Sequence, residues 1–170
     1  MSDFLEIDVE SLLASMAGEI TALLKKRNVT DPVMIGIHSG GVWLAERLHR
    51  LLNIAEPLGT LDISFYRDDF TRIGMHPQVT PSHLPFDLDN RHIVLVDDVL
   101  YTGRTLRAAL NEIFDYGRPA SVMLAVLVDR GGRELPIEAA VIGQRMELNS
   151  HQHIKLHGPG ALRLSVSKRD

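Results

Sequence analysis

The stretch HIVLVDDVLYTGRTLRAAL, His92–Leu110, decides the fold class of this chain. Its apolar run, Ile93–Val96, predicts a strand buried on both faces, as in the centre of a parallel sheet. Two acids, Asp97 and Asp98, stand where this strand is expected to end, and a polar turn leads into a helix that begins around Thr105. A strand, a polar turn and a helix in this order are typical of an α/β protein that binds its ligand at the carboxyl end of the strand.

The same alternation of strands and helices extends along the rest of the chain. Helical spacing of apolar residues predicts helices that begin after Asp8, at Val42 and at Thr105. Apolar runs predict strands at 32–37, 60–65, 93–96 and 121–128, with further strands at 139–143 and within 153–166. We therefore expect residues 1–170 to form a single α/β domain, with a mostly parallel central sheet flanked by helices and a C-terminal β extension.

One long segment, from Tyr66 to Leu88, has no sustained period of apolar residues and contains Pro77, Pro81 and Pro85. Loops of this length are uncommon inside a compact domain and usually serve function. We expect a flexible lid loop from about Arg67 to about Leu84.

The composition narrows the class of protein. The chain has 18 Lys and Arg against 22 Asp and Glu, a formal net charge of -4, and no cysteine. The absence of cysteine excludes disulfides, thiolate catalysis and cysteine-based zinc sites. The negative net charge argues against a surface covered with positive charge for binding nucleic acid. The N-terminus carries acids where a signal peptide is basic, and the apolar runs are shorter than the ~18 residues of a membrane span. We expect a cytoplasmic protein that does not enter a membrane.

The residues after the two acids are suited to an anion. Tyr101, Thr102, Gly103, Arg104 and Thr105 lie at the expected helix N-terminus, where free amides and the helix dipole attract a phosphate. The carboxylates would instead accept hydrogen bonds from vicinal hydroxyls, or hold Mg²⁺ through water. A phosphate beside a diol describes a ribose 5-phosphate.

The two acids have two other interpretations. Asp97 and Asp98 could simply cap a turn and a helix, because Asp is common in turns. They could also belong to a receiver domain, but there the paired acids follow the first strand, near the N-terminus. The ordered combination of strand, acids, Thr-Gly-x-Thr and helix favours the ribose phosphate.

The motif VLVDDVLYTGRT resembles the phosphoribosyl pyrophosphate motif of type I phosphoribosyltransferases. Three further stretches, DISFYRDDF, GRPASVMLAVLVDRGGRELPI and GVWLAERL, resemble the PyrR family, which comprises bifunctional pyrimidine operon regulators with uracil phosphoribosyltransferase activity. The resemblance implies a type I phosphoribosyltransferase fold that converts uracil and phosphoribosyl pyrophosphate to UMP and pyrophosphate with Mg²⁺.

The resemblance also implies roles for individual residues. Asp97 and Asp98 would hold the ribose hydroxyls, with Mg²⁺ nearby through substrate and water and without a direct protein ligand. The 5-phosphate would lie against Val99, Leu100, Tyr101, Thr102, Gly103, Arg104 and Thr105. Pyrophosphate would meet Arg67 and the loop of His38, Ser39, Gly40 and Gly41, where we expect a strained or cis peptide. The base would lie against Val128, Asp129 and Arg130.

The chain departs from the family pattern at two places. Ser39-Gly40-Gly41 stands where close relatives usually carry Thr-Arg-Gly, which removes a fixed cation near pyrophosphate. Gly132 stands where RNA-regulating relatives often carry His. In such relatives a basic dimer face binds the leader RNA of the pyrimidine operon, and the cations that could contribute here are Arg118, Arg130, Arg133 and Arg145.

Three functions therefore stay open at this point: a uracil phosphoribosyltransferase, an RNA-binding attenuator that senses UMP, and a phosphoribosyltransferase for a purine base. The first two can coexist in one homodimer or larger homo-oligomer. The phosphate motif alone does not separate uracil from a purine, and the stretch VLVDRGGREL favours uracil by resemblance.

Overall fold

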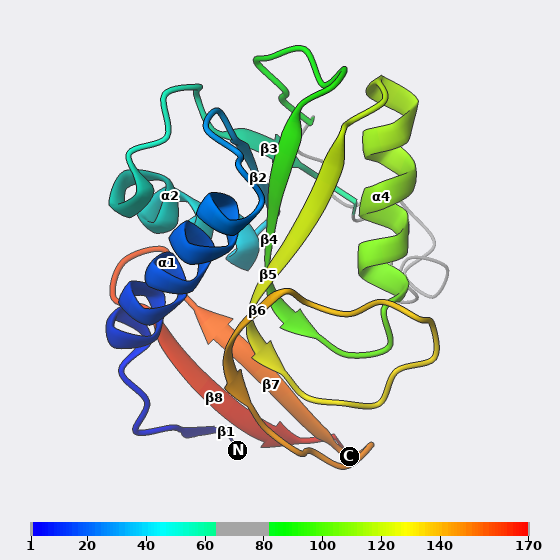
Figure 1. Ribbon diagram of the computed structural model, residues 1–170. Coiled ribbons are helices and arrows are strands. Elements are labelled where there is room, and N and C mark those ends of the chain that lie inside the picture. The colour runs from blue at the N-terminus through cyan, green and yellow to red at the C-terminus, as the bar shows by residue number, and fades with distance from the viewer. Residues whose placement is uncertain (1, 64–81, 170) are drawn as a thin grey trace.

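A computed structural model describes residues 2–63 and 82–169 of the chain. Its centre is a five-stranded parallel sheet with the strand order β3-β2-β4-β5-β6. The strands are β2 (Val33–Ile37), β3 (Gly59–Leu61), β4 (His92–Leu100), β5 (Ser121–Asp129) and β6 (Val141–Arg145). Helices α1 (Val9–Lys26) and α2 (Gly40–Leu52) cover one face, and α4 (Arg104–Tyr116) covers the other (Figure 1).

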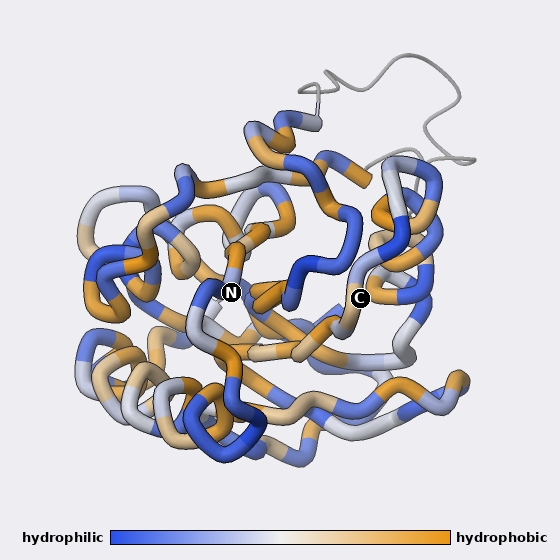
Figure 2. Tube along the Cα trace, turned by 45° about the horizontal axis from the view of Figure 1, so that its top comes forward, coloured by the Kyte–Doolittle hydropathy of each residue, from blue (hydrophilic) through white to orange (hydrophobic). Residues whose placement is uncertain are grey.

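Alternating side chains of the central strands build a separate core on each face of the sheet. Met34, Val94 and Val96 pack with α1 and α2, whereas Ile35 and Leu95 pack with α4. Successive residues of a strand point to opposite faces, so a strand covered on both sides must be apolar throughout. This explains the unbroken apolar runs of the sequence. Figure 2 shows that hydrophilic and hydrophobic residues are instead mixed along the helices.

The helices begin and end close to the expected residues. The Asp8 carboxylate accepts a hydrogen bond from the Ser11 amide at 3.1 Å and caps α1. Gly117 follows the last residue of α4. Helix α2 begins two residues earlier than expected, so that Gly40 and Gly41 form its first turn. Within the described residues, no helix combines the length and apolarity that a membrane crossing requires.

Two strand predictions need correction. Strand β4 does not end before the acids but continues to Leu100, because its second half still pairs with β5 from Asp97↔Val126 to Leu100↔Asp129. Strand β3 has three residues, shorter than the predicted 60–65. Phe65 and most of the expected lid fall within 64–81, outside the described residues.

The C-terminal β extension is confirmed as an antiparallel hairpin of β7 (Gln152–His157) and β8 (Arg163–Lys168). The short strand β1 (Ser2–Phe4), which sequence patterning missed because all three residues are exposed, pairs with β8. This second sheet lies beyond the carboxyl ends of β4 and β5 (Figure 1). Ile154, Leu156 and Leu164 of the hairpin belong to the same buried cluster as α1 and α2.

We propose that this shared cluster makes residues 1–170 fold as one domain. Replacing the fully buried Leu164 with Ala should then lower the free energy of unfolding of the whole chain by about 2–5 kcal/mol, because it leaves a cavity in the common core. Urea unfolding followed by both circular dichroism and Trp43 fluorescence measures this. The exposed Leu51→Ala is the matched control. Two separate transitions would contradict a single domain.

Candidate functional site

A crevice opens at the carboxyl edge of the central sheet between β2 and β4. The chain leaves β2 for α2 on one face of the sheet and leaves β4 for α4 on the other. Since β2 and β4 are neighbours, their connections diverge and leave a space between them, which is where open α/β sheets bind ligands. A cleft of about 870 Å³ occupies this edge and extends to β7 of the second sheet.

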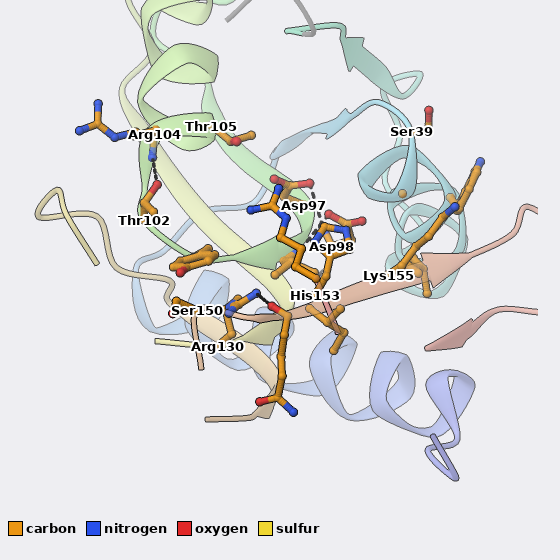
Figure 3. A pocket seen from close by; sticks show the side chains of 18 residues that line it. Ser39, Asp97, Asp98, Thr102, Arg104, Thr105, Arg130, Ser150, His153 and Lys155 are labelled. Carbon is orange, nitrogen blue, oxygen red and sulfur yellow. Dashed lines mark hydrogen bonds between the residues drawn. The ribbon is translucent and has the colours of Figure 1, made fainter. Parts of the chain in front are cut away.

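Asp97 and Asp98 line the middle of this cleft (Figure 3). Asp97 is buried and its Oδ1 accepts a hydrogen bond from the Asp98 amide at 2.8 Å. Asp98 is half-buried and its Oδ1 accepts from the Val99 amide at 2.8 Å. Backbone bonds at one oxygen of each carboxylate orient both groups, so the site carries two positioned acids on one strand.

The turn after β4 forms one end of the cleft. Thr102 Oγ1 accepts a hydrogen bond from the Arg104 amide at 3.2 Å. Gly103 has φ +93°, a left-handed conformation that favours glycine, and it turns the chain into α4. Helical geometry leaves the first amides of α4 without intrahelical partners, and the residues at this helix start that line the cleft are Thr102, Arg104 and Thr105.

Of the residues expected around the phosphate, five line the cleft and two do not. Val99, Tyr101, Thr102, Arg104 and Thr105 line the cleft. Leu100 is fully buried in the core with α4, and Gly103 packs against Ile137 behind the turn. These two residues shape the turn through their backbone.

The loop between β2 and α2 forms the opposite end of the cleft. Ser39 and Gly40 line it, while His38 and Gly41 do not. The His38–Ser39 peptide bond is cis, as expected for this loop. A Cβ at Gly40 would overlap Asp98 Oδ2, and one at Gly41 would lie 2.6 Å from the Val96 carbonyl oxygen. The close approach of the loop to the β4 backbone therefore requires glycine at position 41, whereas a side chain at position 40 would have to displace the Asp98 carboxylate.

The turn after β5 is held by an internal ionic network. Asp129 is buried; its Oδ1 accepts from the Gly131 amide at 3.0 Å, and its Oδ2 accepts from Arg133 at 2.6 Å and Arg145 at 3.4 Å. Burial raises the pKa of the Asp129 carboxyl, but the hydrogen bonds and the two guanidinium charges outweigh it, so the pKa lies below its ordinary value. Val128 is fully buried, and of the three residues expected to meet the base, Arg130 alone lines the cleft.

Arg130 is a buried cation that connects two walls of the cleft through hydrogen bonds and stacking. Its Nη1 donates to the Gln152 carbonyl at 3.0 Å and its Nη2 to the Asn149 carbonyl at 2.9 Å, and its guanidinium stacks on Tyr101 at 3.8 Å from the ring centroid. Burial lowers the pKa of the Arg130 guanidinium. Arg130 thus joins the central sheet to the segment before β7 and presents the Tyr101 ring to the cleft.

Several lining residues were not anticipated from the sequence, and they are Trp43, Ser150, Gln152, His153, Lys155 and Arg169. Most belong to the C-terminal extension, whose strand pattern gave no signal that β7 folds back over the carboxyl edge. Trp43 is half-buried and lines the cleft from α2. Arg67 lies outside the described residues.

No group of three or more His, Asp or Glu side chains that could hold a metal ion occurs within 2–63 and 82–169. The two carboxylates of Asp97 and Asp98 are hard oxygen donors in a cleft open to solvent. Mg²⁺ typically keeps several waters and binds through one or two carboxylates and substrate phosphates. The donor set therefore fits a cation that arrives with a phosphorylated substrate.

Comparison with known proteins places the chain among phosphoribosyltransferases. The family model described as phosphoribosyl transferase domain matches residues 8–157. A protein of Nitrosococcus oceani named bifunctional protein PyrR is 56% identical over 166 residues, covering 96% of this chain and 94% of its own. The protein of the same name in Pseudomonas paraeruginosa is 58% identical over 153 residues, covering 90% of each chain.

Solved structures share the fold at lower identity. The hypoxanthine phosphoribosyltransferase of Trypanosoma cruzi aligns with a TM-score of 0.69 at 19% identity, covering 95% of this chain and 93% of its own. A purine phosphoribosyltransferase from Pyrococcus horikoshii aligns with a TM-score of 0.61 at 28% identity, covering 82% and 83%.

The ionic network at Asp129 predicts a dependence of stability on pH. A carboxyl whose folded pKa is lowered stabilises the fold above its unfolded pKa of about 3.9, and this stabilisation is lost as the pH falls through the folded pKa. Asp129→Asn should therefore lower the urea midpoint at pH 7 and flatten its decline below about pH 4. Asp115→Asn, on the exposed side of α4, is the matched control. An unchanged decline in Asp129→Asn would show that the network does not stabilise the fold.

Proposed function

Because the chain belongs to the phosphoribosyl transferase domain family and, within it, to the PyrR family, we propose that it transfers the phosphoribosyl group of phosphoribosyl pyrophosphate to uracil, forming UMP and releasing pyrophosphate. The observation that carries this proposal is the juxtaposition in one cleft of two oriented carboxylates and an anion-binding turn at the start of α4.

The geometry supports one direction for the substrate along the cleft. The 5-phosphate would accept hydrogen bonds from the first amides of α4 and from the hydroxyls of Thr102 and Thr105. The ribose hydroxyls would donate to the carboxylates of Asp97 and Asp98, of which Asp98 is the more exposed. Pyrophosphate would then point towards Ser39 and Gly40 at the opposite end.

The base would enter beside Arg130 and Tyr101, on the side of the cleft covered by the second sheet. The Tyr101 ring is backed by the Arg130 guanidinium and the residue is 37% exposed, and the exposed part of the ring would pack against a flat heterocycle. Asp129 and Val128 would act on the base indirectly, by holding this turn in place.

The reaction forms a bond between N1 of uracil and C1 of the ribose and breaks the bond between C1 and the pyrophosphate oxygen. N1 loses its proton, and pyrophosphate leaves with the electron pair. Positive charge grows on the ribose ring and negative charge on the leaving group, so positioned charges and exclusion of water accelerate the step without a protein nucleophile. Asp97 and Asp98 orient the ribose and place negative charge next to the developing cation.

Mg²⁺ fits this cleft as a cation held by the substrate and by water near Asp97 and Asp98. When bound, it would neutralise charge on the pyrophosphate oxygens and so stabilise the leaving group. The carboxylates would hold its water ligands.

Lys155 is the residue best suited to supply the positive charge that the loop of Ser39, Gly40 and Gly41 does not carry. It is exposed on β7 and lines the same cleft, and Figure 3 shows it on the side of Ser39, away from Thr102. Among the described residues it forms no ion pair, whereas Arg104 pairs with Glu134 and Arg130 is held by carbonyls. Lys155 is therefore available to a pyrophosphate oxygen.

The experiment that tests the proposed function is UMP formation from phosphoribosyl pyrophosphate and a panel of bases, with and without Mg²⁺. We expect uracil to be used in preference to hypoxanthine and guanine, and activity to require the metal. The double variant Asp97→Asn with Asp98→Asn keeps the side-chain size but removes both charges, and it should lower kcat/KM by about 100-fold or more. Wild-type activity in this variant would refute the role of the acids, and preference for a purine would favour the alternative enzyme.

Removal of the Lys155 charge should weaken binding of phosphoribosyl pyrophosphate. Because a hydrogen bond to a charged group contributes about 1.5–3 kcal/mol, Lys155→Met should raise the KM for this substrate by about 10- to 100-fold, with a smaller effect on the KM for uracil. Lys168→Met, an exposed lysine of β8 that does not line the cleft, is the matched control. Equal KM values in both variants would rule out the assignment.

Binding of pyrimidine-operon leader RNA is the second candidate function, favoured by the word bifunctional in the names of the relatives. Of the four arginines considered from the sequence, Arg118 and Arg145 are exposed, but Arg130 and Arg133 are held by internal hydrogen bonds. Fewer cations are thus free to meet phosphates than the sequence indicated. A homodimer would present the exposed pair twice.

We therefore expect catalysis to be the stronger activity and RNA binding to depend on Arg118 and Arg145. Titration of the organism's own leader RNA at several salt concentrations, with and without UMP, measures this. Replacing both arginines with Ala should weaken binding and reduce its salt dependence, whereas Lys26→Ala on α1 should not. Affinity no greater than for an unrelated RNA would argue against regulation through RNA.

A further inference from the structure

Arg133 makes directional hydrogen bonds that have no role in the proposed catalysis or RNA binding. Its Nη1 donates to the Tyr101 carbonyl at 2.9 Å, its Nη2 to Asp129 Oδ2 at 2.6 Å, and its Nε to the Ile137 carbonyl at 2.8 Å. The side chain is 18% exposed. All three nitrogens of the guanidinium are therefore engaged inside the protein.

The acceptors of Arg133 belong to different parts of the site. Tyr101 opens the turn proposed to hold the 5-phosphate. Asp129 ends β5 and holds the turn proposed to lie beside the base, through its bond to the Gly131 amide. Ile137 belongs to the connection between β5 and β6. A single planar group thus fixes the separation of the two ligand-binding turns.

Backbone contacts surround this bridge and make it stiff. The Glu134 and Leu135 amides donate to the Thr102 carbonyl at 2.9 and 3.1 Å, and the Arg130 amide donates to the Leu100 carbonyl at 3.1 Å. A Cβ at Gly132 would lie 2.7 Å from the Tyr101 ring, so the backbone of the turn after β5 also packs closely against this ring. A shift of either turn must therefore be followed by the other.

We propose that Arg133 is a positioning residue that couples occupancy of the 5-phosphate turn to affinity for the base. This inference rests on the proposed function for the identity of the two ligands. Arg133 does not line the cleft, so it acts on substrate through Tyr101 and Asp129. A phosphate bound to the turn at 101–105 would favour one position of the Tyr101 carbonyl, and Arg133 would carry this preference to Asp129 and Gly131.

Arg145 provides a control that separates coupling from charge. It pairs with the same Asp129 oxygen at 3.4 Å, but it is 73% exposed and, within the described residues, has no hydrogen bond to the turn after β4. Loss of Arg145 removes a positive charge next to Asp129 and leaves the bridge intact. Loss of Arg133 removes a charge and the bridge together.

The experiment measures the affinity of the full-length protein for uracil by calorimetry, with and without saturating ribose 5-phosphate. In the wild type, ribose 5-phosphate should tighten uracil binding by about 5- to 100-fold, the range typical of coupled sites. Arg133→Lys keeps the charge but loses the planar fork, and Arg133→Ala loses both, so the factor should fall towards one in each. Arg145→Ala should keep the wild-type factor. Guanidinium ion should restore part of the factor to Arg133→Ala.

A full coupling factor in Arg133→Lys and Arg133→Ala would overturn the proposal, as would an equal loss in Arg145→Ala. If the Arg133 variants do not fold, hydrogen exchange of the wild type tests the proposal instead. Ribose 5-phosphate alone should slow exchange of the backbone amides in 131–137. Unchanged exchange rates would overturn the proposal. These are binding measurements, so failure of the proposed reaction appears separately, as absence of UMP formation by the wild type.

Discussion

The pairing of β4 with β2 on one side and β5 on the other is the constraint on which this structure depends. It buries the residues from Ile93 to Val96 on both faces and carries the strand onward through Asp97 and Asp98. A parallel strand in this position has no freedom to change register, because a shift of one residue would exchange its two buried faces. The acids are therefore held at a fixed position along β4, at the carboxyl edge of the sheet, and the cleft forms around them.

The closeness of the loop before α2 to β4 is the second consequence of this pairing. Gly41 lies so close to the Val96 carbonyl that its position has no room for a Cβ, and Gly40 lies against the Asp98 carboxylate. Ser39 can in this way face the same cleft as the carboxylates. Gly40 brings no positive charge to this end of the cleft, and Lys155, which lines the same cleft from the second sheet, is the residue proposed to supply it.

Arginines serve two different purposes around the cleft. Arg130 and Arg133 are held by carbonyls and by Asp129, and they stabilise the turns that would touch the ligands. Arg145 is largely exposed and contributes little more than charge to the same network. Sequence composition counts these residues alike, but their chemistry differs because a guanidinium held by carbonyl and carboxylate oxygens inside the protein is not free to bind a phosphate.

The sequence by itself determined the order of strands and helices, the carboxylate pair and the turn after it. These features are local: apolar runs, the cap at Asp8, Gly103 and Gly117 act within a few residues of where they stand. The family resemblance likewise rests on contiguous motifs. The end of β4 was misplaced, since pairing with β5 outweighs the tendency of two acids to end a strand.

Only the tertiary structure decided which residues meet across the cleft. The hairpin of β7 and β8 returns over the carboxyl edge because Ile154, Leu156 and Leu164 share a core with α1 and α2. This brings His153 and Lys155 opposite Asp98, from more than fifty residues away in the chain. The contacts of Arg133 with Tyr101 and Asp129 likewise appear only in the folded chain. Such contacts depend on how buried surfaces fit together in space, and no local pattern of residues encodes that fit.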